Sequence, residues 1–581
     1  MTLPGSAPRR SRRWFLGASA TAAGFVVLRC GGGASSPPAG TPDPFQTPGG
    51  STATLPPGIT VTPTPAGDPS LVMTGFVLGD GQFDPHRTQV GTIQGQQAFV
   101  YSRLLTFQDQ AQGLLKPDLA VDLPEQPDEL TYVFELNPAA RWHDVDPLNG
   151  RPLTADDVVY SFDRQRLGDR SVFVRKARWL AIDTIEALDS HTLAITTAAP
   201  MAPMISWLAD ANAFIVAPEV ESTGFSLEPR GQIGSGPYQW VEWDEFNFAS
   251  VRANENWHGG TPRLAGITVR QPFDTPQVEA ALRVKDLDAA FVGRLTADSL
   301  KRAVPDLVES HVGNALFFGM RFGTATPPFN DIRVRTALSI AMDRQDMVEQ
   351  FFQGSGDGSA WVSWPVTQWA MSSSDLSQKP GHRLGSGGRD QDIRDARQLI
   401  EAYRADGNEF AGPLTLYVEQ TSEQILSLGS FMARHVFEAL GTEVTVEPRP
   451  VEELAALLLD PQQQLPWVAG PDSGWLDLDD WLYPYFHSAG AQNSFALRNP
   501  DLDALIEAQR SEFDAATRHQ LGLQIQEQLL LVNAGVNLVS ERVVSLQRPY
   551  VHAFPLDVMD GYQDRFAECW IDVTDPTFRG R

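Results

Sequence analysis

From Leu71 almost to the C-terminus, strand-like runs alternate with helix-like segments, and this alternation constrains the fold most strongly. Runs such as TYVFEL at 131–136 place apolar residues at every second position, as in a half-buried strand. The segment 331–352 instead repeats its apolar residues at three-, four- or seven-residue spacing, as in a helix capped by Asn330. A chain of 581 residues is too long for one hydrophobic core, so we expect an α/β protein of two or three domains.

The same two patterns recur along the rest of the chain. Further strand-like runs lie at 191–197, 248–252, 266–270, 413–418 and 442–447. Further helix-like segments lie at 277–285, 391–405, 421–440, 501–510 and 515–533. The stretch 353–390 is long, polar and rich in Gly, Ser and Trp. Loops of this length are usually functional or disordered, and we expect one of these two properties here.

The stretch LTADDVVYSFDR at 153–164 places two acids side by side behind a threonine. Paired carboxylates can do acid/base chemistry or hold a metal, but they can also start a helix. Thr154 is a good N-cap, and Asp157 follows three residues later, as in a capping box. Neighbouring helical residues point about 100° apart, so Asp156 and Asp157 cannot easily share a ligand. We interpret the pair as the beginning of a helix.

The first 30 residues are typical of an export signal. The stretch Ser11–Leu16, with its paired arginines, closely resembles the twin-arginine signal. The uncharged run that ends at Leu28 has 15 residues, which is short for a membrane span and right for a signal-peptide core. Cys30 resembles the lipid-accepting cysteine of bacterial lipoproteins, although Arg29 departs from the small residue usual before it. We expect an exported protein, periplasmic or at the cell surface, anchored through lipidated Cys30.

Residues 31–69 differ sharply in composition from the remainder. Ten of these 39 residues are proline, and most of the others are Gly, Ser, Thr or Ala. Such a segment cannot bury a core, so we expect a disordered tether. No other segment approaches the length and apolarity of a transmembrane helix.

Charge and motifs narrow the function classes. The formal net charge of −27 argues against nucleic-acid binding, which uses basic patches. There is no His-Glu-x-x-His, no Cys-x-x-Cys, no Gly-x-Ser-x-Gly elbow and no phosphate-binding loop. Besides Cys30 the chain has only Cys569, which we interpret as a buried, inert thiol. We therefore expect neither an enzyme nor a bound metal or cofactor.

Several stretches, taken in order, resemble the extracytoplasmic solute-binding proteins of the peptide/nickel class, the oligopeptide- and dipeptide-binding family of ABC importers. The resemblance covers about residues 71–555, nearly all of the expected mature chain. It is carried by FDPHRTQ (83–89), LTADDVVYSFDR with ARWHDVDPLNGRP before it, GSGPYQWVEWDEFNFASVRANENWHGGTPRLAGITVR (234–270), KDLDAAFVG (285–293), FNDIRVRTALSIAMDRQDMV (329–348) and NPDLDALIEAQRSEFDAATRHQLGLQIQEQLL (499–530). Lys285-Asp286 departs from the family pattern, in which Gly usually precedes the acid.

The resemblance implies a two-lobed α/β fold of the type II periplasmic-binding-protein class, with an extra subdomain in the first lobe. Crossing strands would join the lobes, and the ligand would bind in the cleft between them as they close by hinge motion. The domain boundaries that we predict are 70–106, 190–315 and 540–581 for the first lobe, 107–189 for the inserted subdomain, and 316–539 for the second lobe.

The resemblance also implies the function. We expect the substrate-binding component of an ABC transporter, a monomer that captures peptides or solutes of similar size and delivers them to a membrane permease. The same fold could instead bind an oligosaccharide or a metal chelate. An exported hydrolase of peptides or esters is a further alternative, but the sequence offers no nucleophile–base pair for one.

The candidate ligand contacts lie mainly in one stretch, WVAGPDSGWLDLDDWLYPYFHS at 467–488. The family uses an aspartate here to pair with a peptide's N-terminal ammonium, and the ungapped alignment places Gly474 at that position. Asp472 or Asp477 could substitute, or both could be solvated loop residues. Large flat side chains supply apolar contact area, but loop tryptophans can equally fix a loop onto the core. The full set of candidate ligand-binding residues is Trp475, Asp472, Asp477, Trp361, Trp364 and Phe83.

Overall fold

The structure is a computed structural model. It describes residues 69–75, 83–88, 91–169, 173, 175–222, 232–244, 247–271, 275–420, 423–450, 453–454, 457–458 and 466–578. The predicted export signal at 1–30, its Cys30, and all but the last residue of the predicted tether lie outside these ranges.

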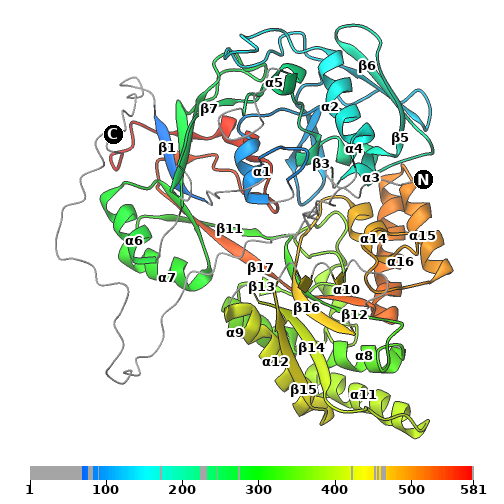
Figure 1. Ribbon diagram of the computed structural model, residues 1–581. Coiled ribbons are helices and arrows are strands. Elements are labelled where there is room, and N and C mark those ends of the chain that lie inside the picture. The colour runs from blue at the N-terminus through cyan, green and yellow to red at the C-terminus, as the bar shows by residue number, and fades with distance from the viewer. Residues whose placement is uncertain are drawn as a thin grey trace, which may run out of the picture.

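One twelve-stranded sheet connects most of the described chain (Figure 1). Its main path runs in the order β15-β14-β16-β12-β17-β10-β1-β9-β8-β7, and β11 and β13 pair with β17 beside this path. The strands are β1 Ser70–Thr74, β7 Tyr238–Asp244, β8 Phe248–Ala253, β9 Gly266–Arg270, β10 Ala289–Val292, β11 Val308–Gly313, β12 Phe317–Phe322, β13 Gly356–Asp357, β14 Leu414–Glu419, β15 Val444–Arg449, β16 Trp467–Asp472 and β17 Gly535–Gln547.

Strand β17 joins two halves of this sheet. Its first residues pair with β12, as in Val539 opposite Phe318, and its last residues pair with β10 and β11, as in Val544 opposite Val292. Residues 535–540 and 544–546 of β17 are buried, and the three residues 541–543 in between are partly exposed. We call the half with β1 and β7–β11 the first lobe and the half with β12 and β14–β16 the second lobe. In Figure 1 β17 runs obliquely across the molecule, with β1 and β7 toward its upper left end and β14–β16 near its lower right end.

Smaller sheets extend the first lobe. β4 (Thr131–Glu135), β6 (Thr192–Thr197) and β5 (Ile182–Ala187) form a three-stranded antiparallel sheet, β2 (Leu105–Asp109) pairs with β3 (Leu114–Pro117), and β18 (Val551–His552) pairs with β19 (Trp570–Ile571). Because β6 lies beyond residue 189, the small sheet uses residues on both sides of the boundary predicted there. The predicted domain boundaries stay predictions.

Helices flank both lobes. Those of the first lobe are α1 Gly91–Gln97, α2 Ala155–Leu167, α3 Lys176–Trp179, α4 Met204–Trp207, α5 Pro218–Ser222, α6 Thr275–Val284 and α7 Arg294–Ala303. Those of the second lobe are α8 Ile332–Ala341, α9 Arg344–Phe352, α10 Ser373–Leu376, α11 Gly385–Ala405, α12 Glu423–Leu440, α14 Leu478–Phe486, α15 Pro500–Arg510 and α16 Ala515–Val532. Buried residues of α8, α9, α11 and α12 pack with those of β12, β14 and β16 into one hydrophobic core.

The periodicity predictions are confirmed for the strands and for most helices. β4, β6 and β14 bury every second residue, as their apolar alternation predicts. The segment 331–352 is different, because it forms two helices that separate at Met342 and Asp343. The Asp343 carboxylate accepts a hydrogen bond from the backbone N–H of Asp346, 2.9 Å away, and begins the second helix. The predicted cap Asn330 is wrong by one residue, because Asp331 caps α8.

The helix-start interpretation of Asp157 is confirmed. Helix α2 begins at Ala155, and the backbone N–H of Thr154 donates to the Asp157 carboxylate at 2.9 Å. That carboxylate also accepts hydrogen bonds from Arg151 at 2.7 and 2.8 Å and from Trp142 Nε1 at 3.2 Å. Asp157 is buried and Asp156 is exposed, so the first acid faces solvent and the second holds the entry of the helix.

Candidate functional site

Two parallel strands of the second lobe bring carboxylates to one edge of the sheet. β14 and β16 end at Glu419 and Asp472. Asp472 forms an ion pair with Arg321 of the neighbouring strand β12. These three residues, with Phe317 and Trp361, are among those that line a cavity of about 90 Å³. A mixed set of aromatic and charged groups at the end of strands is a common arrangement in ligand sites.

Asp477 has a structural partner instead. Its carboxylate receives two hydrogen bonds from Arg518, at 2.7 and 3.0 Å, and caps α14 by accepting from the backbone N–H of Asp479 at 2.8 Å. The side chain is 2% exposed. Burial alone would raise the pKa of Asp477, but the charge and hydrogen bonds of Arg518 lower it below its usual value. A ligand could pair with this carboxylate only by displacing Arg518.

Asp480, three residues later, connects the two lobes. It accepts hydrogen bonds from Arg178 Nε at 2.9 Å and from Trp207 Nε1 at 3.2 Å, and Arg178 Nη2 lies 2.8 Å from its second oxygen. Arg178 also pairs with Asp210 at 3.2 Å. All four side chains are largely buried. The first lobe therefore supplies two donors to a single carboxylate of the second lobe.

Trp475 lies at the same lobe contact. It is 3% exposed, and the guanidinium carbon of Arg175 lies 4.0 Å from the centre of its ring. Arg178 approaches the same ring at 5.8 Å. Such cation–π contacts hold Trp475 against the first lobe. Its position facing the other lobe is the one expected of a cleft residue, and its ligand-binding role stays a prediction.

A sequence model of the bacterial extracellular solute-binding proteins, family 5, covering the middle region of that family, matches residues 115–493. The chain belongs to this family. The matched residues include those that line the Asp472 cavity, as well as Asp477 and Asp480, whereas Arg518 lies beyond the match.

The names of several curated relatives of this family 5 protein refer to peptide binding or to ABC transporters. A putative ABC transporter peptide-binding protein of Brucella ovis is 26% identical over 306 residues, which cover 50% of this chain and 55% of the relative. The dipeptide-binding protein of Escherichia coli is 25% identical over 313 residues, covering 49% of this chain and 56% of that protein. These alignments span about half the length of the relatives. The dipeptide-binding protein DppE of Bacillus subtilis is 23% identical over 442 residues, covering 72% of this chain and 77% of that protein.

Solved structures share the two-lobed periplasmic-binding-protein fold that the resemblance implied. The substrate-binding protein CtaP of Listeria monocytogenes superposes with a TM-score of 0.71 at 20% identity, covering 87% of this chain and 99% of that one. The oligopeptide-binding protein AppA of Bacillus subtilis, in complex with a nonapeptide, gives a TM-score of 0.68 at 17% identity, with the same coverage. At these identities the likeness shows the fold alone, and it confirms the predicted fold class.

The remaining candidates of the family 5 site are spread over the molecule. Trp361 lines the Asp472 cavity, and its Nε1 donates to the carbonyl of Trp481 at 2.6 Å. Trp364 instead packs at the lobe junction, where its Nε1 donates to the Ser540 carbonyl of β17 at 3.3 Å. Phe83 belongs to the first lobe and meets Trp243 edge-on at 5.2 Å. The structure thus brings Trp361 and Asp472 together, and it places Trp364 and Phe83 in other surroundings.

Gly474, the position at which the ungapped alignment would place the family's aspartate, is packed closely against the backbone. A Cβ atom at this position would lie 2.3 Å from the backbone of Ala315, in the segment that joins β11 to β12. Real Cβ atoms do not approach other atoms so closely, because of steric repulsion. The position has no room for a side chain unless this segment moves.

Sequence reasoning missed Asp480 and Arg178, and the only signal was the acid-rich run itself.

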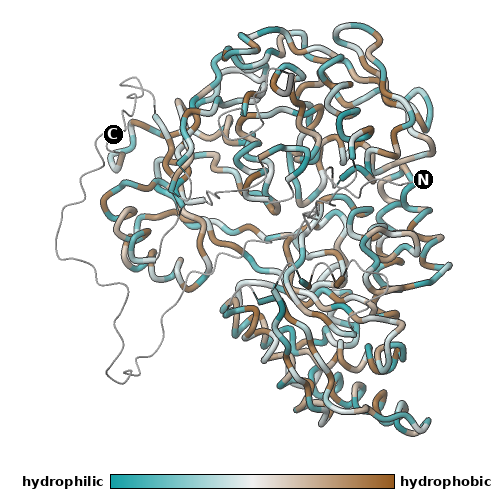
Figure 2. The backbone as a smooth tube through the Cα atoms, viewed as in Figure 1, coloured by the Kyte–Doolittle hydropathy of each residue, from teal (hydrophilic) through white to brown (hydrophobic). Residues whose placement is uncertain are grey.

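Within the described ranges, no group of three His, Cys, Asp or Glu side chains could hold a metal ion. Among the described helices, none has the length and apolarity to cross a membrane. Figure 2 agrees, since short hydrophobic and hydrophilic stretches alternate along the tube. Cys569 is buried as predicted, and burial raises its pKa to about 12.

Proposed function

We propose that this protein is the substrate-binding component of an ABC importer, which captures peptides or solutes of similar size between its lobes and delivers them to a membrane permease. The match of residues 115–493 to the family 5 solute-binding proteins carries the proposal. The names of the curated relatives support a peptide ligand, and the passage of β17 through both lobes suits a hinge.

In this proposal Asp472 is the carboxylate that faces the ligand, and Trp361 and Trp475 supply apolar surface. Asp472 lines a cavity together with its partner Arg321, whereas Asp477 does not line it and is held by two hydrogen bonds from Arg518. A partly buried carboxylate can fix a cationic or hydroxyl-rich end of a ligand through charge-assisted hydrogen bonds. The same arrangement would serve an oligosaccharide, and a metal chelate is a further possible ligand of this fold.

The ligand can be identified by native purification followed by mass spectrometry of the co-purified small molecules. Calorimetry with that ligand then compares Asp472→Asn with Asp477→Asn. For a peptide, Asp472→Asn should cost about 2–5 kcal/mol of binding free energy, as when one partner of a buried charge pair is stranded. For a sugar the cost should be about 1–3 kcal/mol.

The control Asp477→Asn should lower the melting temperature through its lost Arg518 contacts. It should leave the affinity of the folded protein within about threefold, as for a site that is not coupled to the ligand, because Asp477 does not line the Asp472 cavity. Wild-type affinity in Asp472→Asn would show that the ligand binds elsewhere. Steady turnover of peptide or ester substrates by the purified protein would contradict the binding role and favour the hydrolase alternative.

We further propose that the chain is exported through its twin-arginine signal, is anchored through lipidated Cys30, and acts as a monomer. Replacing Arg12 and Arg13 by lysine should trap precursor in the cytoplasm, because receptors read the arginine pair as an address. Cys30→Ser should release the protein from the membrane fraction. Unchanged export of the first variant, or unchanged membrane retention of the second, would refute the respective assignment.

A further inference from the structure

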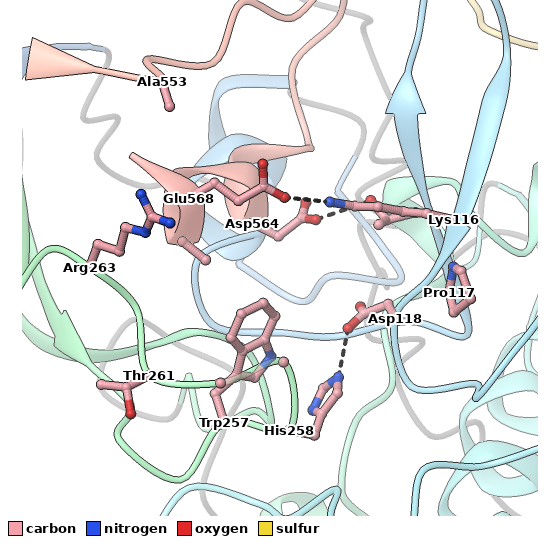
Figure 3. A pocket seen from close by; sticks show the side chains of 14 residues that line it. Lys116, Pro117, Asp118, Trp257, His258, Thr261, Arg263, Ala553, Asp564 and Glu568 are labelled. Carbon is pink, nitrogen blue, oxygen red and sulfur yellow. Dashed lines mark hydrogen bonds and ion pairs between the residues drawn. The ribbon is translucent and has the colours of Figure 1, made fainter. Parts of the chain in front are cut away.

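A second cavity, of about 540 Å³, lies in the first lobe and shares no lining residue with the Asp472 cavity. Its walls come from the end of the β2–β3 hairpin, from residues 257–263 between β8 and β9, and from residues 553–568 near the C-terminus (Figure 3). Its size falls within the roughly 300–1,000 Å³ typical of small-molecule sites. None of the candidate ligand residues considered above belongs to it.

Charged side chains on the walls are already paired with each other. His258 Nε2 lies 2.9 Å from Asp118 Oδ1, and these side chains are 2% and 6% exposed. Lys116 Nζ lies 2.9 Å from Glu568 Oε1 at the more open side. Figure 3 shows the two pairs on different walls, with the indole of Trp257 near the His258 pair.

The third carboxylate of the cavity, Asp564, is paired with a cation that does not itself line the cavity. Asp564 accepts a hydrogen bond from Arg103 Nη2 at 2.6 Å and another from Thr106 Oγ1 at 3.1 Å. Lys116 and Arg263 line the cavity and Arg103 lies behind Asp564, so these three permanent cations balance the three carboxylates of the lining. A strongly charged ligand would have to compete with an existing pair and would lose its own hydration, which is costly. The cavity therefore favours a neutral ligand.

Two buried nitrogen atoms of the cavity have unused hydrogen-bonding capacity. Trp257 Nε1 and His258 Nδ1 are buried and find no hydrogen-bond partner among the described residues. Because His258 Nε2 faces a carboxylate, it carries the proton in the neutral ring, and Nδ1 is an acceptor. Two residues of the lining thus carry one unsatisfied N–H donor and, with the imidazole neutral, one unsatisfied acceptor, and the paired carboxylates keep further lone pairs.

Gly259 leaves room for the indole of Trp257 because it has no side chain. A Cβ atom there would lie 2.4 Å from the six-membered ring of Trp257. The ring of Trp257 can therefore pack against the backbone at Gly259, two residues later in the chain. A flat aromatic surface beside hydrogen-bonding groups suits a ligand that has both an apolar face and hydroxyl groups around its edge.

We propose that this cavity binds a neutral, hydroxyl-rich solute the size of a mono- or disaccharide, with its apolar face on Trp257. Its hydroxyl groups accept from Trp257 Nε1 and donate to His258 Nδ1 and to the free lone pairs of Asp118 and Glu568. This site is separate from the cleft between the lobes, and its occupancy does not depend on whether the protein transports peptides.

The test uses the full protein and named probes. Saturation-transfer NMR and calorimetry measure binding of glucose, N-acetylglucosamine and maltose, with glucosamine and glucuronate as charged counterparts. The variants are Trp257→Ala, Trp257→Phe and Gly259→Ala, and Asp156→Asn, an exposed residue of α2 that lines neither cavity, is the control. The Phe variant keeps a flat ring and loses the N–H, so it tests the site even if the Ala variant fails to fold.

At least one neutral saccharide should bind saturably, and each Trp257 or Gly259 variant should weaken it roughly three- to tenfold, the range of a single aromatic contact. Asp156→Asn should leave it unchanged. The proposal is wrong if no neutral probe saturates by about 10 mM, a concentration above the Kd of a millimolar site. It is also wrong if a charged probe binds more tightly than its neutral counterpart, or if the Trp257→Phe and Gly259→Ala variants bind like the wild type.

Discussion

Asp480→Asn should open the molecule, because it removes the charge that ties the lobes together. In the wild type this carboxylate meets Arg178 through contacts of 2.8 and 2.9 Å and Trp207 at 3.2 Å, in a largely buried setting. Loss of one partner from a buried pair typically costs about 3–5 kcal/mol. Arg178 keeps its contact with Asp210 at 3.2 Å, so we expect about 3 kcal/mol, the lower end of that range.

We expect this cost to fall on the closed arrangement, because separation of the two lobes would part Arg178 from Asp480. A loss of about 3 kcal/mol corresponds to a roughly 100-fold weaker preference for closure. Small-angle X-ray scattering should give a larger radius of gyration for Asp480→Asn than for wild type. Stopped-flow measurements with the co-purified ligand should show faster dissociation.

Asp479→Asn is the matched control. Asp479 is the preceding residue, is equally buried, and pairs within the second lobe with Gln509 at 2.7 Å and Arg510 at 3.1 Å. It should lower the melting temperature without changing the radius of gyration. If Asp480→Asn matches the wild type in both scattering and dissociation rate, the lobe contact does not stabilise closure and the reasoning fails.

Three further predictions concern stability. Asp157→Asn should cost about 2 kcal/mol by thermal or urea unfolding, as hydrogen bonds to a charged group weaken, while the exposed Asp156→Asn should stay within about 0.5 kcal/mol; equal effects would refute the capping role. Although Glu541 keeps part of its surface exposed, its partial desolvation raises its pKa to about 7. The wild type should therefore lose stability as pH rises from about 4.5 to 7 relative to Glu541→Gln, reaching roughly 1–3 kcal/mol at pH 8; parallel pH profiles of melting temperature would contradict this. Gly474→Ala should cost about 1–3 kcal/mol through overpacking against Ala315, and an unchanged melting temperature would disprove the clash.

Local patterns made most elements predictable. Alternation at 131–135 and 414–419 identifies strands whose one face is buried, because side chains of a strand alternate between two sides. The break between α8 and α9 was less visible, since apolar spacing continues through it. Asp343 did carry a signal, because aspartate is a preferred N-cap residue. Its carboxylate accepts a hydrogen bond from the backbone N–H three residues later, as a helix N-cap does.

Partners that are distant in the chain explain what the sequence could not predict. The acid-rich run contains Asp477, Asp479 and Asp480, which look alike in sequence. Arg178 lies 302 residues from Asp480, whereas Arg518 lies 41 residues from Asp477. No spacing rule links such pairs, so only the fold tells which carboxylate joins the lobes and which one caps a helix.

The Gly474 position bears on the ligand itself. At the position that the ungapped alignment assigns to a ligand-pairing aspartate, this chain has a glycine packed against Ala315. The nearby carboxylate of Asp472 is already paired with Arg321, whose cationic charge persists even though burial lowers its pKa. An incoming ammonium group would therefore share a carboxylate that is partly neutralised, and it would gain less than at an unpaired one. The combination favours ligands held mainly by apolar contacts and by hydrogen bonds over ligands that depend on a free N-terminal charge.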